Sequence, residues 1–482
     1  MEPKIIQETD EKEKEDISKK LLFKRKHGFD SINQEQFKEI MDFAEMYKNF
    51  ISFSKTEREC IDSIKQLSKQ NGFVNIKKAK KEDQKLFFEF DKVCGGLAYI
   101  KDPNDLENGF LILGSHIDSP RLDLKQMPIY ETLDMCYAKT HYYGGIKKYQ
   151  WVTRPLALHG VVVLTSGEVV NIVIGEAETD PVFTINDLLP HLAQQQSAKS
   201  AKTVIEGENL NILIGSVPYN FQKKSNSVKL NILNILNQKY GIVEEDFISA
   251  ELELVPAGLA RDVGLDLSFV GGYGQDDRVC SFCGMQALFN IISKSPELIS
   301  KNLMIIFFDK EEIGSQGNSG ANSNLVERIF NSILYLHGKT EQNSLINSLA
   351  NSQLLSADVN VGIDPEWRSV CEENNCAKIG YGVALTKFTG SGGKSNSNEA
   401  HAEFVARIRK AFNQDGVLYQ PAELGKVDQG GGGTIAKYLA SYGMQVCDCG
   451  TPVLSMHAPF EISSKADVFH TYKAYLSFYK LK

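Results

Sequence analysis

The fold of this chain is decided by residues 303–312, which read Leu303-Met304-Ile305-Ile306-Phe307-Phe308-Asp309-Lys310-Glu311-Glu312. An uninterrupted apolar run that stops at charged residues is typical of a strand buried on both faces of a sheet. Such a sheet is covered by helices, and a helical pattern at 279–294 lies directly before the run. The stretch therefore predicts an α/β protein.

Towards the N-terminus, a second apolar run at 110–113 is preceded by two predicted helices. Apolar residues at 37–51 recur with helical spacing. Thr56 and Glu59 have the spacing of a capping box that opens the second helix, and Gly72 is expected to end it. These helices have an ordinary structural role.

Residues 150–260 carry a different pattern. The runs at 161–164 and 169–174 flank a Ser-Gly-Glu turn and predict two paired strands. The stretch 194–228 is rich in Gln, Ser, Lys and Asn, and it predicts a surface excursion inside a smaller β-rich module. Residues 390–398 and 430–433 are predicted loops.

The composition is that of a soluble globular protein, with 482 residues, 42% of them hydrophobic and 24% charged. This length suggests two or three domains, or one large domain with an insertion. The 53 basic and 61 acidic residues give a net charge of −8, which disfavours nucleic acid and anionic lipid as partners.

The predicted location is the cytoplasm. The charged run at 1–20 is interpreted as a tail or an exposed helix, and it has no apolar signal segment. No later segment approaches the ~18 apolar residues of a membrane span. Nine cysteines are an odd number without a zinc-finger spacing, so we expect buried free thiols in a reducing compartment.

Metal-binding and proton-transferring residues follow predicted strands at five places, where open α/β sheets usually place their sites. On an extended segment His116 and Asp118 point to the same side, so Asp118 could hold the second nitrogen of a metal-bound imidazole. Glu311 and Glu312 point in different directions, so one could bind a metal while the other takes a proton. The other three places hold Asp276, Asp358 and His457.

Each place alone also has an ordinary interpretation. His116 can be a buried core histidine, Asp276 can cap the helix that follows it, and the paired glutamates can form a solvated loop. The set together favours a site, because two cations ~3.5–4 Å apart need a bridging carboxylate and about two further ligands each. The residues that meet this count are His116, Asp276, Glu312, Asp358 and His457. Glu311 then remains as a general base, and imidazole with carboxylate suits zinc, with cobalt or manganese as substitutes.

With these residues in view, nearly the whole chain resembles the aspartyl aminopeptidase and vacuolar aminopeptidase I family of dinuclear zinc exopeptidases. The stretches that carry the resemblance are Gly-Ser-His-Ile-Asp-Ser-Pro-Arg at 114–121, Tyr143-Gly144-Gly145-Ile146, Gln275-Asp276-Asp277-Arg278, Asp309-Lys310-Glu311-Glu312-Ile313-Gly314-Ser315, Ser356-Ala357-Asp358, Gly433-Thr434-Ile435 and Ser455-Met456-His457.

The resemblance implies a three-layer α/β/α catalytic domain with a mixed sheet, formed by residues 1–124 and 261–482. Residues 125–260 would be an inserted, smaller β-rich dimerisation domain. Members of the family assemble as tetrahedral dodecamers, so a homo-oligomer is implied.

The implied activity is metal-dependent hydrolysis of the N-terminal residue from short peptides with a free N-terminus. One of two divalent cations, most simply zinc, would be held by His116, Asp276 and Asp358, and the other by Asp276, Glu312 and His457. The catalytic set would be Glu311, as general base towards a water that bridges the metals, and Asp118, which would hold His116.

Two further residues are implied to bind substrate. Lys394 stands where acidic-specific members carry a more basic stretch, and His191 is matched to a histidine that reaches the site from a partner subunit. With Lys394 alone, the choice between acidic and neutral N-terminal residues stays open.

Three other functions compete with this interpretation. One is a related dinuclear amidohydrolase or deacylase, and another is a catalytically silent scaffold of the same family. The third, a nucleotide-binding protein with a phosphate loop at 430–433, is disfavoured because no Lys-Ser or Lys-Thr follows the glycines.

Overall fold

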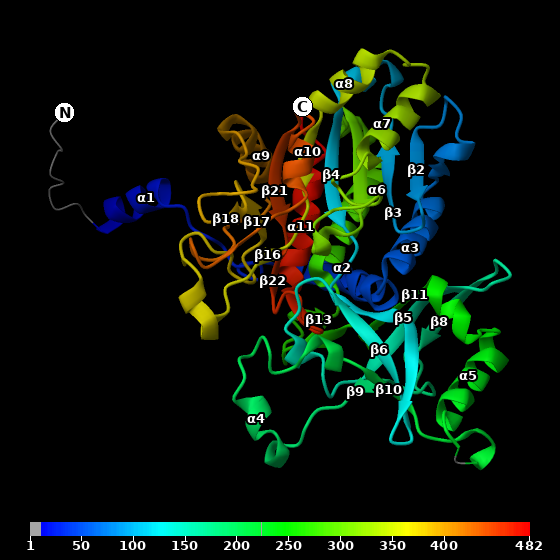
Figure 1. Cartoon of the computed structure of the whole chain (residues 1–482). Coiled ribbons are helices and arrows are strands. Elements are labelled where there is room, and N and C mark those ends of the chain that lie inside the picture. Colours follow the sequence, from blue (N-terminus) through cyan, green and yellow to red (C-terminus); the bar gives the residue numbers. More distant parts are fainter. Residues whose placement is uncertain (1–10, 223) are drawn as a thin grey trace.

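The computed structural model describes residues 11–222 and 224–482, which form a larger α/β part and a smaller β-rich part (Figure 1). In the described residues the larger part is built on a nine-stranded sheet. Its strands, in spatial order, are β1 (Val74–Asn75), β2 (Lys85–Phe90), β3 (Cys94–Tyr99), β14 (Asn302–Phe308), β4 (Phe110–His116), β15 (Gln353–Ser356), β21 (Gln445–Gly450), β17 (Val383–Thr386) and β19 (Tyr419–Pro421). The sheet is mixed, because β14, β4, β15 and β21 are parallel whereas β3 and β17 run antiparallel to their neighbours β14 and β21.

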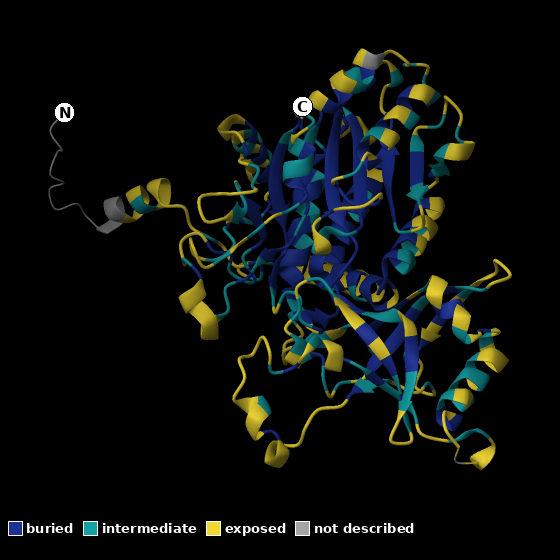
Figure 2. Ribbon diagram, in the orientation of Figure 1, coloured by how far each residue is buried: buried dark blue, intermediate teal, exposed yellow. Residues whose placement is uncertain are grey.

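Strand β14 contains the apolar run that predicted the fold, and it is buried on both faces, as expected. Its alternate side chains Leu303, Ile305 and Phe307 pack into the core on one face of the sheet. The intervening Met304, Ile306 and Phe308 pack into the core on the other face. Figure 2 shows this sheet as the most deeply buried part of the molecule.

Helices cover both faces of the sheet, so the larger part has three layers. One core is closed by α2 (Gln34–Phe53), α3 (Glu57–Gln70), α6 (Gln275–Lys294), α9 (Ala402–Gln414) and α11 (Lys465–Phe478). The other core is closed by α7 (Leu325–Leu336), α8 (Gln342–Ala350) and α10 (Ala436–Ala440). The predicted three-layer α/β/α fold is therefore confirmed.

The second N-terminal helix, α3, begins and ends where the sequence predicts. At α3 the Thr56 hydroxyl accepts from the backbone N–H of Glu59, and the Glu59 carboxylate accepts from that of Thr56. Gly72 follows this helix with a φ of 80°, the left-handed region that glycine favours. Helix α1 (Glu11–Leu21) extends from the body, and residues 1–10 of the predicted charged run lie outside the described residues (Figure 1).

The smaller part is a seven-stranded sheet with α5 (Ser227–Tyr240) and α4 (Gln194–Ser197) around it (Figure 1). Its strands, in spatial order, are β8 (Val169–Ile174), β7 (Leu156–Val163), β11 (Ala250–Pro256), β5 (Arg121–Thr132), β6 (Met135–Tyr143), β10 (Ile212–Gly215) and β9 (Thr184–Ile185). Strands β7 and β8 pair antiparallel across the predicted turn. The β-rich insertion expected from the sequence is present.

Two small sheets complete the described structure. A five-stranded sheet contains β12 (Arg261–Val263), β13 (Phe269–Gly272), β23 (Glu461–Ser464), β22 (Pro452–Leu454) and β16 (Asn360–Val361), and a two-stranded sheet contains β18 (Gly390–Ser391) and β20 (Gly431–Gly432). All nine cysteines are buried free thiols. Among residues 11–222 and 224–482, the helices are too short or too polar to cross a bilayer.

Candidate metal centre

The five predicted ligands meet at one edge of the large sheet. His116 is the last residue of β4, Glu312 lies in the turn after β14, and Asp358 follows β15. These strands are parallel, so their carboxyl ends converge. Strands β13 and β22 of the five-stranded sheet lead into Asp276 and His457. Segments far apart in the sequence are thereby brought to one place.

The carboxylate of Asp276 lies between two histidines. Its Oδ1 is 3.1 Å from His116 Nε2, and its Oδ2 is 3.2 Å from His457 Nε2. Asp358 Oδ1 lies 3.9 Å from His116 Nε2, and Glu312 Oε2 lies 3.3 Å from His457 Nε2. The result is two three-residue groups with Asp276 in both, and in each group the candidate ligand atoms lie within 4.8 Å of one another.

The residues present fit a divalent cation in each group. Glu312 Oε1 is buried without a hydrogen-bond partner in the described structure. Buried carboxylate oxygens are unfavourable unless they are hydrogen-bonded, paired or bound to a metal. Imidazole nitrogen and carboxylate oxygen are donors that zinc accepts. The alternative role of Asp276 as a helix cap is not observed, since α6 has no side-chain cap.

Both histidines are oriented through their other ring nitrogen. His116 Nδ1 lies 3.1 Å from the carbonyl oxygen of Asp118 and 3.2 Å from its carboxylate Oδ1. His457 Nδ1 lies 3.0 Å from the carbonyl oxygen of Gly145. An Nδ1–H group that donates to an oxygen leaves Nε2 free for a metal. Asp118 therefore lies next to His116 Nδ1, and its role towards a metal-bound imidazole stays a prediction.

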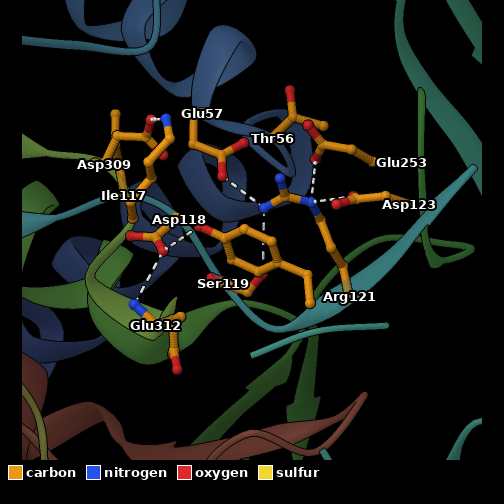
Figure 3. Close-up of polar contacts among 12 residues, drawn as sticks. Thr56, Glu57, Ile117, Asp118, Ser119, Arg121, Asp123, Glu253, Asp309 and Glu312 are labelled. Carbon is orange, nitrogen blue, oxygen red and sulfur yellow. Dashed lines mark hydrogen bonds and ion pairs between the residues drawn. The ribbon is translucent and has the colours of Figure 1, made fainter. Parts of the chain in front are cut away.

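Asp118 also binds the segment that carries the two glutamates (Figure 3). Its carboxylate accepts from the backbone N–H groups of Glu311 and Glu312, each at 3.1 Å, and from the Tyr143 hydroxyl at 2.8 Å. Burial opposes the charge of Asp118, but hydrogen bonds with His116 and Tyr143 hold its pKa below the usual value. One carboxylate therefore fixes a histidine and two glutamates.

Glu311 is placed differently from Glu312, as the sequence suggested. The backbone of Lys310 is left-handed, with a φ of 63°, and it turns the chain between β14 and the glutamates. The Glu312 carboxylate faces His457, whereas Glu311 belongs to neither ligand group. Burial raises the pKa of the Glu311 carboxyl to about 7, with the Asp118 and Asp276 charges acting in the same direction.

Glu461, at the start of β23, is a supporting residue that the sequence did not predict. Its Oε1 accepts from the backbone N–H of His457 at 2.8 Å, and its Oε2 accepts from those of Gln275 and Asp276 at 2.6 and 3.2 Å. Glu461 is buried, and burial raises its pKa to about 8. In the sequence Glu461 is visible only as a lone acidic residue shortly after His457.

In the described structure no hydrogen bond or ion pair joins Lys394 or His191 to either ligand group. Lys394 Nζ lies 2.9 Å from Glu399 and 4.0 Å from the centre of the Phe388 ring. His191 is exposed in the smaller part, beside a surface hollow of about 740 Å³. Substrate binding by these two residues stays a prediction.

The α/β/α fold and the paired imidazole and carboxylate groups define a metal-dependent hydrolase. Residues 50–479 match the model of the Aminopeptidase I zinc metalloprotease (M18) family. The chain belongs to this M18 family and is a zinc metalloaminopeptidase, so the family resemblance seen in the sequence is confirmed.

Relatives in bacteria match more than nine-tenths of the chain. The probable M18 family aminopeptidase 1 of Clostridium acetobutylicum is 48% identical over 466 residues, which cover 95% of this chain and 98% of that protein. The corresponding protein of Thermotoga maritima is 46% identical over 440 residues, which cover 91% and 96%.

Solved structures agree with the fold. The M18 aminopeptidase of Thermotoga maritima has a TM-score of 0.90 at 44% identity, and aminopeptidase I of Clostridium acetobutylicum has 0.88 at 46%, each covering 95% of this chain and 99% of the other. The S. cerevisiae mApe1 dodecamer has a TM-score of 0.72 at 21% identity and covers 92% and 97%, which is a similarity of fold alone.

Proposed function

We propose that this aminopeptidase hydrolyses the first peptide bond of short peptides with two metal ions and Glu311 as general base. The observation that carries the proposal is the position of Asp276, whose two oxygens face His116 and His457 from either side. A carboxylate shared between two ligand groups is what a two-metal site requires. His116 and Asp358 would complete one group, and Glu312 and His457 the other.

Two divalent cations bound there would make a water molecule acidic and polarise the scissile carbonyl. Glu311 would remove a proton from the attacking water and pass a proton to the leaving amine nitrogen. Asp118 would keep Glu311 in place through its hydrogen bond to the Glu311 backbone N–H. It would also keep His116 turned with Nε2 towards Asp276.

The base is tested with Glu311→Gln, which keeps the shape of the side chain but cannot accept the proton. We expect full zinc content and a loss of nearly all peptidase activity. Glu403→Gln is the matched control, because Glu403 is exposed in the first turn of α9. Normal turnover by Glu311→Gln would remove Glu311 from the role of base.

The class of substrate is tested with aminoacyl chromogenic compounds and dipeptides, with zinc, cobalt or manganese supplied. We expect turnover of substrates with a free α-amino group and none of their N-acetylated counterparts. Cleavage of the acetylated forms would instead favour a deacylase, and no turnover of any compound would favour a silent scaffold. The same panel, with Asp, Glu, Leu and Ala at the first position, measures the side-chain preference.

We further propose that residues 1–124 and 261–482 form the catalytic domain and that residues 125–260 mediate self-association in the cytoplasm. Exposed apolar side chains support an interface in this insertion, among them Phe221, Leu133 and Leu192 at 90%, 87% and 70% exposure. The buried free cysteines support a reducing compartment. Native mass spectrometry should detect a homo-oligomer, with a dodecamer as the expected form, and a monomer at micromolar concentration would contradict it.

A further inference from the structure

One short segment at the end of β6, in the seven-stranded sheet, contacts residues on both sides of the candidate metal centre. Tyr143 is the last residue of β6, and its hydroxyl donates to Asp118 Oδ2 at 2.8 Å. Two residues later, the carbonyl of Gly145 faces His457 Nδ1 at 3.0 Å. Between them Gly144 has a φ of 72°, and a Cβ there would lie 3.4 Å from the Glu312 Cβ. The segment thus packs directly against the candidate ligands.

The ring of Tyr143 is held from behind by Arg121. The guanidinium carbon of Arg121 lies 4.0 Å from the centre of the ring, close enough for a cation–π contact. Arg121 Nη1 lies 2.6 Å from Glu57 on α3, and its Nε lies 2.8 Å from Asp123 and 3.2 Å from Glu253 of the seven-stranded sheet.

Figure 3 shows the carboxylates of Glu57, Asp123 and Glu253 around the guanidinium group of Arg121. Arg121 is 8% exposed, and Glu57 and Glu253 are 3% and 7% exposed. Buried, multiply paired groups have few alternative positions. The arginine therefore fixes the tyrosine to the larger part through Glu57 and to the smaller part through Asp123 and Glu253.

We infer that Tyr143 is a positioning residue for the aminopeptidase reaction and acts through Asp118. Without its hydroxyl, Asp118 Oδ2 keeps only the donor from Glu312. The Asp118 carboxylate then has more freedom to rotate, although it must hold both His116 and the Glu311 backbone. The inference rests on the proposed function, and it means that the smaller sheet helps to build the catalytic site of its own chain.

The test is Tyr143→Phe, which removes one hydroxyl and keeps the ring on Arg121. Tyr142→Phe is the matched control, because Tyr142 is 42% exposed on the same strand and its hydroxyl makes no hydrogen bond within the described structure. We expect Tyr143→Phe to lower kcat by about 10- to 100-fold with little change in KM, as is usual for groups that orient metal ligands. Zinc affinity, measured by chelator competition on folded protein, should fall as well. The control should match the parent in both measurements.

Equal kcat and equal zinc affinity in Tyr143→Phe and Tyr142→Phe would overturn the inference. A double-mutant cycle with Asp118→Asn examines the route, because two changes that act through one carboxylate should not add. If Asp118→Asn does not fold, the comparison of Tyr143→Phe with Tyr142→Phe still tests whether Tyr143 is a positioning residue. The proposed function has a separate test, because it fails if Glu311→Gln is active. A weaker zinc affinity in Tyr143→Phe is expected whether or not Glu311 is the base.

Discussion

Glu461 and His457 are joined by a 2.8 Å hydrogen bond from the histidine backbone N–H to the buried glutamate Oε1. The other oxygen of Glu461 accepts from the backbone of Asp276 at 3.2 Å. The Glu461 side chain thus sets the position of Asp276 relative to His457. A backbone held in this way has little freedom to adjust when a ligand is lost.

Glu461→Gln should therefore weaken the second ligand group. The amide has nearly the same size, but one of its two acceptors becomes an NH₂ group that faces a backbone N–H. We expect zinc affinity to fall by about 10- to 100-fold, the usual range for groups that support metal ligands. Chelator competition measures the loss, with Glu403→Gln as control. An unchanged affinity would show that the backbone is held without Glu461.

If the proposed site binds two metals, His457→Ala should lose one of them. The ring is the only imidazole in the group with Asp276 and Glu312, while His116 and Asp358 keep the first group complete. Metal analysis after dialysis should give about half the parent stoichiometry. The control is His401→Ala, at an exposed position before α9. The parent stoichiometry in His457→Ala would exclude it as a ligand.

A pH-dependent contact joins the two parts of the molecule. His159 on β7 is 4% exposed, with Nδ1 2.7 Å from Glu59 on α3 and Nε2 3.0 Å from Glu176. Burial opposes the imidazolium form, but the hydrogen bonds with Glu176 and Glu59 outweigh it and raise the pKa of His159 above 6.5. The native state therefore binds this proton more tightly than the unfolded chain does.

The sign of the effect follows from that difference. The stabilisation by His159 is complete below pH 6.5 and is lost as the pH rises through the raised pKa of the folded state. His159→Gln removes this dependence, so its melting temperature should fall furthest below the parent at pH 6 and approach it at pH 9. A constant difference across this range would contradict the charged form of His159.

Lys394 as a substrate-binding residue predicts a selective loss in Lys394→Met. A hydrogen bond between charged groups contributes ~1.5–3 kcal/mol, so kcat/KM for peptides that begin with Glu should fall about tenfold or more. Peptides that begin with Leu should be unaffected. Lys387→Met is the matched control, because Lys387 also lies near Glu399, at 3.9 Å. Equal effects in the two variants would assign Lys394 to loop structure.

The ligand set could be proposed from the sequence because its members stand at the end of a strand or a few residues after it. Parallel strands end at one edge, so His116, Glu312 and Asp358 had to meet once the sheet was predicted. The apolar run at 303–308 was sufficient to predict that sheet, since it has no polar face to expose.

The contacts that hold the candidate ligands in place could not be predicted from the sequence in the same way. Glu461 accepts hydrogen bonds from backbone N–H groups. Such groups are present in almost every residue, so the sequence does not show which of them Glu461 binds. Tyr143 reaches Asp118 only because the smaller sheet is docked against α3 through Arg121. Such contacts depend on how separate parts of the chain are packed, and the pattern within one segment does not encode them.

The position of β14 between β3 and β4 has a consequence for synthesis on the ribosome. Strands β3 and β4 are complete by residue 116, but the strand that joins them begins at residue 302, after the whole seven-stranded sheet. Until then the nascent chain has unpaired strand edges, which promote aggregation. His457 emerges later still, so neither folding nor zinc capture can be completed during most of translation. We expect slow, chaperone-dependent maturation, as for other folds dominated by distant contacts.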